Sequence, residues 1–493
     1  LFGPRTVRDV FGMVGDGPMA PLRGVEEDKI RVFLQGLQLV DVRTQLFAVD
    51  SMREGATDDY ALFRDAWMQR RHYQIFGDQV RKGDDSLPGY LRDDEDPAAV
   101  SAEALALVPD DAAGLRAKVL GIHARALAAT GRYDEAQSVG LDALELAERL
   151  DLNELASDAI TTLSGLKKTG PKESLRAALA DAVARAQETG ALDAELRGRF
   201  LLGRSYQDWA EFDESERWFR SGIERGLEAG VPWAPYALEA RWQLSWVLLV
   251  RGDWDEALAL CDVRDQTPPP IPRGLLEGLR LTILFARGED VSAELAALRR
   301  FWPREGGIVI HAAAVAIRQA GRRGDPAAVV AAYDDAVLVL TRIWHEWFSA
   351  RIRLAAVTIG ALASGIPAMS AAERAEYLAR AEQLHADGRT VLDRYTDPSG
   401  FWGPEGRAWV KRLDAEILHL RWLVGTDAPP LGVLVDTWRE DAVLFEDFGD
   451  VHELARSRAT LAAILRASGD LAGARELGDL ARETAHRLGA QPL

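Results

Sequence analysis

Cysteine is almost absent from this sequence, which has a single one, Cys261, among 493 residues. One cysteine excludes an internal disulfide framework and every metal site that needs several thiolates. It is also typical of proteins in a reducing compartment, so we expect a cytoplasmic protein. Cys261 lies in an apolar run, which predicts a small buried thiol rather than a nucleophile.

Long apolar runs and basic clusters are also missing. The longest apolar stretches, such as 244–250, reach only about a third of the roughly 20 residues that a membrane-spanning helix needs. The 77 acidic residues outnumber the 59 basic ones, which gives a net charge of -18, and no run of five or more Lys or Arg occurs. This charge repels phosphate backbones. We therefore expect neither a membrane span nor direct binding of nucleic acid.

Motifs for catalysis and for cofactors are absent as well. The eight histidines include no pair at metal-ligand spacing, and the sequence has neither a G-x-x-x-x-G-K-[S/T] phosphate loop nor a G-x-S-x-G elbow. Each of these motifs supplies groups that the corresponding chemistry requires. We expect no enzyme activity, no metal and no cofactor.

What the chain does contain is helical patterning. Residues 1–97 begin with an irregular segment rich in Gly and Pro, followed by helical periodicity over 28–49 and 59–76 and a charged loop over 82–97. From residue 98 onward Ala, Leu, Arg and Glu fill helix-length stretches between short turns marked by Gly or Pro, and the alternating pattern of β-strands is missing. The sequence therefore predicts an all-α fold.

A recurring turn divides these helices into repeats. The turn places Gly or Ala before an acidic residue and an aromatic or apolar residue, and it recurs roughly every 36 to 42 residues. Gly can end one helix in a left-handed conformation, and the acidic residue suits the start of the next helix. The clearest copies lie at 131–136, 210–215, 252–257, 324–329 and 469–474, and weaker ones begin at Gly170 and Gly288.

The best-defined unit resembles a tetratricopeptide repeat. Small and large residues alternate in it at spacings that pack two antiparallel helices. These residues are Leu202, Gly203, Tyr206, Ala210, Phe212, Ser215, Phe219 and Gly222. The resemblance implies a tetratricopeptide-like α-solenoid, that is, a superhelix of antiparallel helix pairs.

We divide the chain into four segments on this basis. An irregular lead-in and helical segment covers 1–97, and tetratricopeptide-like repeats cover 98–364. Residues 365–425 form an interrupted helical region with several Gly and Pro, and 426–493 form a C-terminal repeat pair.

The last segment carries a second resemblance. Its residues are Trp438 to Ala442, Phe448 to Asp450, His452 to Arg458, Leu461, Ala462, Gly469 to Leu471, Ala474, Arg475 and Ala485 to Ala490. This segment resembles the end of the helical-repeat sensor domain in large, ATP-binding, LuxR-type bacterial transcription regulators of the maltose-regulator-like group. In that family an ATPase precedes the repeats and a DNA-reading helix-turn-helix follows them. The resemblance implies that the ATPase and the DNA-binding domain are partners of this chain within a longer protein. A sequence that begins Leu1-Phe2-Gly3-Pro4, without a methionine, agrees with this expectation.

Candidate ligand-binding residues lie on the first helices of three repeats, which line the inner face of such a superhelix. An exposed aromatic pair beside Arg and Gln donors suits the stacking of a sugar or an apolar ligand, and the inner arginines suit an acidic peptide. The alternative is that 237–250 form a helix buried on all sides. The candidates are Lys118, Arg125, Arg197, Phe200, Arg204, Gln207, Glu239, Trp242 and Trp246.

The sequence thus predicts a non-catalytic sensor domain of a bacterial transcription regulator. It would bind a small-molecule effector or a partner protein on its concave face. A protein-interaction scaffold and a peptide-binding quorum receptor remain as alternatives.

Overall fold

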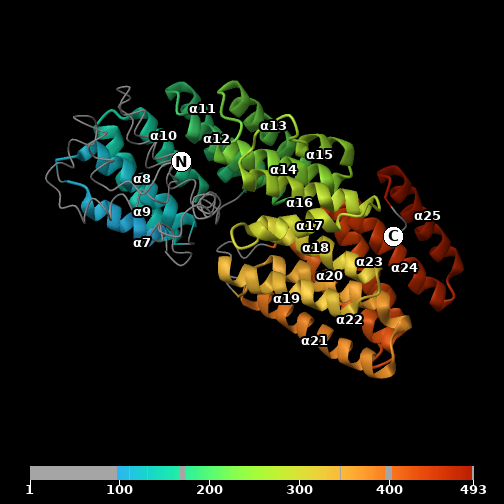
Figure 1. Cartoon of the computed structure of the whole chain (residues 1–493). Helices are drawn as coiled ribbons and strands as arrows, with labels where there is room; N and C mark the ends of the chain where they lie inside the picture. The colour runs from blue at the N-terminus through green and yellow to red at the C-terminus, as the bar shows by residue number, and fades with distance from the viewer. Residues whose placement is uncertain are drawn as a thin grey trace. The chain divides into compact units, whose positions relative to one another are not determined.

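A computed structural model describes residues 97–109, 111–129, 132–166, 172–344, 346–394 and 402–490 (Figure 1). The helices expected over 28–49 and 59–76, the loop before residue 97, and the repeat turns at Gly131 and Gly170 lie outside these residues. Those predictions therefore stay predictions.

The described residues form α-helices and two short 3-10 turns, with no β-strand among them. The expected all-α fold is confirmed. No helix within the described ranges combines the length and the apolar character that crossing a bilayer requires. The helices are α7 (Pro97–Leu107), α8 (Ala113–Ala129), α9 (Tyr133–Arg149), α10 (Asn153–Gly165), α11 (Lys172–Thr189), α12 (Leu192–Gln207), α13 (Phe212–Glu228), α14 (Pro235–Arg251), α15 (Trp254–Cys261), α16 (Pro270–Ala286), α17 (Ser292–Leu298), α18 (Gly306–Arg322), α19 (Pro326–Ile343), α20 (Ala350–Gly365), α21 (Ala371–Arg394), α22 (Pro404–Val424), α23 (Leu431–Phe448), α24 (Val451–Ser468) and α25 (Leu471–Leu488).

The chain divides into two compact units, each built by the same packing rule. The N-terminal unit contains the described residues up to Gly203 with Ser221–Ala240 and Pro269–Ile271, and the remaining described residues form the C-terminal unit. In the N-terminal unit each of α8, α9 and α10 packs on the next helix, and α8 also packs on α10. In the C-terminal unit α20 packs on both α18 and α22, and these helices also contact α19 or α21. Contacts between both successive and alternate helices are the signature of an α-solenoid of helix pairs.

The repeat turns form as the sequence predicts wherever the structure describes them. Gly252, Gly288, Gly324 and Gly469 all have positive φ, and Ala210 adopts the same left-handed conformation in the unit that lacks a glycine. After two of these turns an aspartate caps the next helix: Asp325 accepts from the Ala328 N–H at 2.9 Å and Asp470 from the Gly473 N–H at 2.9 Å. Such caps satisfy backbone donors that the first helical turn leaves free.

Residues 365–425, predicted as an interrupted region, consist mainly of the long helices α21 and α22, of 24 and 21 residues. Pro367 lies in the 3-10 turn before α21, and Pro404 occupies the first turn of α22. Both positions tolerate proline because the first turn of a helix needs no internal N–H bond. Pro367 and Pro404 therefore lie at helix boundaries.

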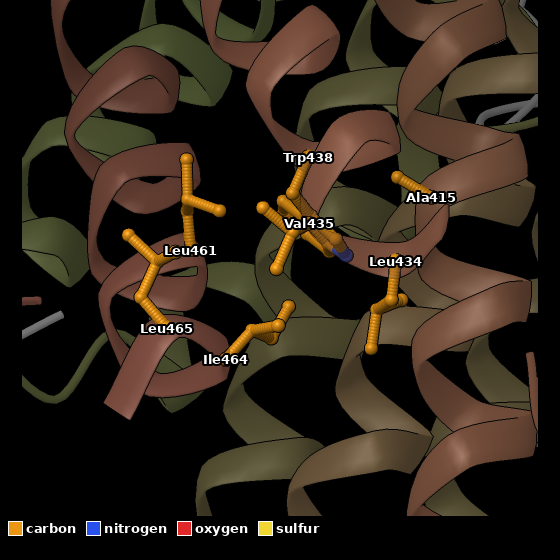
Figure 2. Close-up of a cluster of buried hydrophobic side chains, with 7 residues drawn as sticks. All are labelled: Ala415, Leu434, Val435, Trp438, Leu461, Ile464 and Leu465. Carbon is orange, nitrogen blue, oxygen red and sulfur yellow. The ribbon is translucent and has the colours of Figure 1, made fainter. Parts of the chain in front are cut away.

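The core between the last helices is apolar and closely packed. Side chains from α22, α23 and α24 meet in one cluster (Figure 2). Trp438 of α23 is 1% exposed, and its burial removes a large apolar surface from water. The cluster consists of Ala415, Leu434, Val435, Trp438, Leu461, Ile464 and Leu465. It fixes α24, whose first turn contributes to the site described next.

Candidate functional site

A cavity of about 380 Å³ lies inside the C-terminal unit. Five helices, α15, α16, α18, α20 and α24, and the end of α14 contribute to its wall. Part of the wall is apolar, and part carries charged groups. The lining residues are Leu249, Trp254, Thr282, Phe285, Ala286, Ala314, Val315, Arg318, Gly321, Arg322, Gly324, Arg353, Val357, Gly360, Ala361, Ser364, Asp450, His452, Glu453 and Arg456. A cavity of this size and mixed character suits a small metabolite.

Helical spacing places these groups on one side of each helix. On α20 the lining residues recur at three- and four-residue steps, from Arg353 through Val357 and Gly360 to Ser364, so they form one stripe. On α18 Arg318, Gly321 and Arg322 do the same. The two helices approach closely where Gly321 faces α20, because a Cβ there would lie 2.9 Å from the Ala361 Cβ.

A buried arginine beside the cavity joins three helices. Arg412 of α22 donates to Asp441 of α23 over 3.0 to 3.2 Å, to Oε2 of Glu453 on α24 at 3.1 Å and to Oγ of Ser457 at 2.6 Å. Burial lowers the pKa of Arg412, but the charges of Asp441 and Glu453 outweigh burial and raise that pKa above its usual value. Arg412 is therefore a charged and saturated structural group, which we call the Arg412 centre together with Asp441, Glu453 and Ser457.

Glu453 extends the Arg412 centre into the cavity. It also pairs with Arg318, and its Oε2 lies 3.6 Å from Nε of Arg456. Burial raises the pKa of Glu453, but the guanidinium groups of Arg318, Arg456 and Arg412 outweigh burial and hold that pKa well below the usual value. Glu453 is thus ionised at neutral pH and is shared among three cations.

The other cavity arginines have little compensation. Arg353 makes no hydrogen bond or ion pair with any described residue, and its guanidinium lies 5.1 Å from the ring centroid of Trp409. Arg322 donates to the Phe285 carbonyl at 3.0 Å. Burial and the neighbouring charge of Arg318 lower the pKa of Arg322, and the same two causes lower the pKa of Arg456 to about 10. The charge of Arg318 thus adds to the cost of burying its neighbours.

Two carboxyl groups resist ionisation, Asp450 in the cavity wall and Glu416, which packs against Gly360 of that wall. Glu416 of α22 is 8% exposed and forms no hydrogen bond or ion pair within the described residues, and burial raises its pKa to about 7. Its Oε1 lies 2.8 Å from where a Cβ on Gly360 would stand. Asp450 caps α24 by accepting from the Glu453 N–H at 2.9 Å, and burial together with the charge of Glu453 raises its pKa to about 7. Arginine charge therefore exceeds carboxylate charge around the cavity near neutral pH.

His452, His311 and Cys261 of the C-terminal unit are buried groups that carry no charge at neutral pH. Burial lowers the pKa of His452 and of His311 to about 3, so both rings are neutral at pH 7. Burial raises the pKa of the Cys261 thiol to about 12, and the residue is 3% exposed, as the sequence predicts. Within the described residues no three His, Cys, Asp or Glu side chains are grouped as a metal ion requires.

The sequence-predicted residues of the N-terminal unit are largely buried. Arg125 donates to Asp158 at 3.0 Å, and Arg197 pairs with the same carboxylate at 2.8 Å. Phe200 packs on Tyr236 with the ring centroids 5.7 Å apart. Glu239 is buried, and Lys118 is half-buried. The structure brings Arg125 and Arg197 together, and their role in ligand binding stays a prediction.

The remaining predicted residues lie in the C-terminal unit. Arg204 and Gln207 both donate to Oε1 of Gln243, at 3.1 and 2.9 Å. Trp242 meets His311 edge to face, with ring centroids 6.2 Å apart. Trp246 is 8% exposed.

The tryptophan pair belongs to a helix that is buried on nearly every side. The Trp246 ring packs against Phe212 and Phe448, and all of 243–250 is buried. This matches the alternative, in which 237–250 form a buried helix. A ligand contact at Trp242 or Trp246 stays a prediction.

Sequence reasoning missed the cavity arginines. Arg318 and Arg353 stand on helices that are otherwise rich in Ala, Val and Ile. A cation on an otherwise apolar helix face can indicate a binding site, because burying an uncompensated charge is unfavourable. The sequence alone does not show that α18, α20 and α24, which are distant along the chain, contribute to the wall of one cavity.

Comparisons with known proteins assign no family. The family model for MlaA lipoprotein matches residues 1–74, which lie outside the described residues and are a small part of the chain. Among curated proteins none matches this chain. One similar solved structure is described as a circular tandem repeat protein with novel repeat topology and enhanced subunit contact surfaces. It is 15% identical, and the match covers 98% of this chain and 96% of that one with a TM-score of 0.15, which is too low to support any inference.

Proposed function

We propose that this chain is the non-catalytic sensor module of a cytoplasmic LuxR-type bacterial transcription regulator and that a small-molecule effector binds in the cavity of its C-terminal unit. The cavity carries this proposal, because about 380 Å³ of space is bordered by Arg353, whose guanidinium has no hydrogen-bond or ion-pair partner among the described residues. Buried polar groups normally have partners, so a cation beside an open space suits a ligand.

The position of the cavity suits a sensor. Its wall includes Arg318 of α18, Arg353 of α20 and Glu453 of α24, three helices that belong to different repeats. A ligand that contacts all three favours the repeat arrangement in which they are correctly spaced, and only such differential affinity shifts an equilibrium. The last repeats resemble those of maltose-regulator-like sensors. This resemblance implies two domains that would respond to the shift, an ATPase before the repeats and a DNA-binding domain after them.

A metabolite panel with a cavity-filling variant tests the proposal. Val357 lines the cavity and is 7% exposed, so Val357→Phe takes up space that the effector needs. Val443, which is 54% exposed on α23, gives the matched control Val443→Phe. We expect at least one metabolite to raise the melting temperature of the 493-residue chain and of Val443→Phe, and to lose at least about tenfold in affinity for Val357→Phe. A panel without any binder, or unchanged binding by Val357→Phe with a native circular dichroism spectrum, would contradict it.

A protein-interaction scaffold is the second candidate, with a peptide-binding quorum receptor as its peptide-specific form. Stacked helical repeats present extended surfaces that bind proteins. Exposed apolar side chains favour this function, among them Val433 at 48% and Leu471 at 60%. Binding of a purified partner or peptide that is equally strong for Val357→Phe, in a chain that binds no metabolite, would favour the scaffold over the sensor.

A further inference from the structure

We propose that the ligand of this cavity is a small organic oxyanion, a phosphoester or a carboxylate, whose charged group is bound by Arg353 together with Arg318 and Arg456. This inference rests on the proposed function, since it names the chemical class of the effector. Arg353 is the primary contact. The apolar part of the cavity wall would cover the rest of the ligand.

Arginine donors that have no hydrogen-bond partner favour an anionic ligand. Arg353 lies near Trp409 but donates to no described residue, so none of its donors is engaged within the described part of the chain. The Nε atoms of Arg318, Arg353 and Arg456 are buried and have no hydrogen-bond partner within the described residues. Guanidinium groups match the planar geometry of carboxylates and phosphates, and charge-assisted bonds of this kind are the strong ones.

The balance of arginine and carboxylate charges around the cavity also favours an anionic ligand. Glu453 is shared by Arg318, Arg412 and Arg456, so its charge does not compensate all three. Arg353 borders the same cavity without any pair. The net charge of the chain is -18, and a surplus of cations within so acidic a protein is a local feature that favours an anionic ligand.

The pKa values separate these arginines from the Arg412 centre. Paired carboxylates raise the pKa of Arg412, whereas the pKa of Arg456 is lowered to about 10 and that of Arg322 is also lowered, by burial and by Arg318. A bound oxyanion would reverse this effect, because an opposite charge nearby favours the protonated form.

The start of α24 adds a further attraction. Asp450 and Glu453 belong to its cap and first turn, and both line the cavity. The N-terminus of a helix carries a partial positive charge that stabilises anions. Asp450 opposes an anion only when it is ionised, and its pKa is raised to about 7.

The opposing acidic groups restrict where the anion binds. Glu416 abuts Gly360, and Glu453 is already engaged with arginines. Arg353 is the one cavity arginine that neither pairs with Glu453 nor donates to a carbonyl among the described residues. The oxyanion group therefore belongs beside Arg353.

Calorimetric titration of the 493-residue chain at pH 6.5 and constant ionic strength tests this assignment. The probes are glucose 6-phosphate and glycerol 3-phosphate, succinate and citrate, and the neutral compounds glucose and glycerol. The variant is Arg353→Gln, and Arg353→Lys retains the charge without the planar fork. Arg439→Gln changes an arginine that is 56% exposed and serves as the matched control.

We expect saturable binding of the phosphoesters or of the carboxylates and none of the neutral compounds, with the stronger series identifying the anionic group. Affinity should fall at least about tenfold in Arg353→Gln, fall less in Arg353→Lys, and stay unchanged in Arg439→Gln. Anion binding that is unchanged in Arg353→Gln would overturn the inference.

The outcome also separates this inference from the proposed function. If only a neutral compound binds, and Val357→Phe abolishes that binding, the cavity is an effector site and the oxyanion assignment is wrong. If no compound of either kind depends on Val357, both proposals fail.

Discussion

The two units each bury an arginine–carboxylate centre, but they arrange it in opposite ways. In the N-terminal unit one carboxylate, Asp158, is shared by Arg125 and Arg197. In the C-terminal unit one arginine, Arg412, is shared by Asp441 and Glu453. Both centres join helices of successive repeats, because their partners lie between 29 and 41 residues apart in sequence.

The two centres differ in which of their arginine nitrogens have no hydrogen-bond partner. All three nitrogens of the Arg412 guanidinium donate hydrogen bonds, whereas Nε and Nη1 of Arg197 have no hydrogen-bond partner among the described residues. The Arg412 centre also continues through Glu453 to the arginines of the cavity. A saturated arginine is explained by structure alone. Arg353, which has no hydrogen-bond or ion-pair partner among the described residues, needs another explanation, and we assign it to a ligand.

Removal of the Arg412 guanidinium should give the largest effect on stability. Arg412→Met leaves Asp441 and Glu453 buried beside each other without their shared cation, and breaking a buried ion pair in this way costs about 3–5 kcal/mol. Denaturant unfolding followed by tryptophan fluorescence measures the loss. Arg482→Met removes an ion pair whose members are 69% and 58% exposed, so it should change stability by less than about 0.5 kcal/mol. Equal effects of the two variants would contradict the structural role of Arg412.

Removal of the negative charge at Asp158 should have an intermediate effect. Asp158→Asn removes the carboxylate charge that Arg125 and Arg197 share, but the amide oxygen still accepts one hydrogen bond and Asp193 stays 3.9 Å from Arg125, so we expect a loss of about 1–3 kcal/mol. The same unfolding measurement applies, and Asp436→Asn is the control because Asp436 is 78% exposed. A larger loss in Asp158→Asn than in Arg412→Met would reverse our ranking of the two centres.

A third stability effect, at Glu416, depends on pH. The folded chain retains the Glu416 proton between pH of about 4.5 and about 7, because the folded-state pKa is raised to about 7, whereas the unfolded chain has released it. Stability from this group is therefore fully present below the unfolded pKa and is lost as pH rises through the folded pKa. Glutamine does not ionise, so Glu416→Gln should be more stable than the wild type by on the order of 2 kcal/mol at pH 8 and nearly equal at pH 5.

Thermal unfolding at the two pH values tests this sign. Glu476→Gln, at an exposed position of α25, is the matched control and should resemble the wild type at both pH values. A Glu416→Gln variant that is less stable than the wild type at pH 8 would show that Glu416 is needed as an anion beside Arg412 and Arg456.

The fold was far more predictable from sequence than the site. The turns at Gly324 and Gly469 are local, since each consists of a left-handed glycine and the capping aspartate that directly follows it in the sequence. The turn motif missed Gly190 and Gly230, which also have positive φ but are not directly followed by an acidic residue as Gly324 and Gly469 are.

The site depends on contacts that no local pattern encodes. Arg318 and Glu453 are 135 residues apart, and their pairing follows from how α18 and α24 pack. Trp246 has the spacing of an inner-face residue, but its ring packs with Phe212 and with Phe448 of α23, which is about 200 positions away in the chain. Helical spacing predicts which residues share a face, and the partner of that face is decided by tertiary packing.

Hydrogen exchange with and without a bound probe tests the central claim, that recognition occurs in the C-terminal unit, most directly. The 493-residue chain would be compared alone, with glucose 6-phosphate and with succinate. The account predicts slower exchange in Gly306–Arg322, Ala350–Gly365 and Val451–Ser468 with whichever probe binds, and unchanged exchange in Ala113–Ala129 and Asn153–Gly165. Protection confined to the latter two helices, with the three cavity helices unaffected, would contradict it.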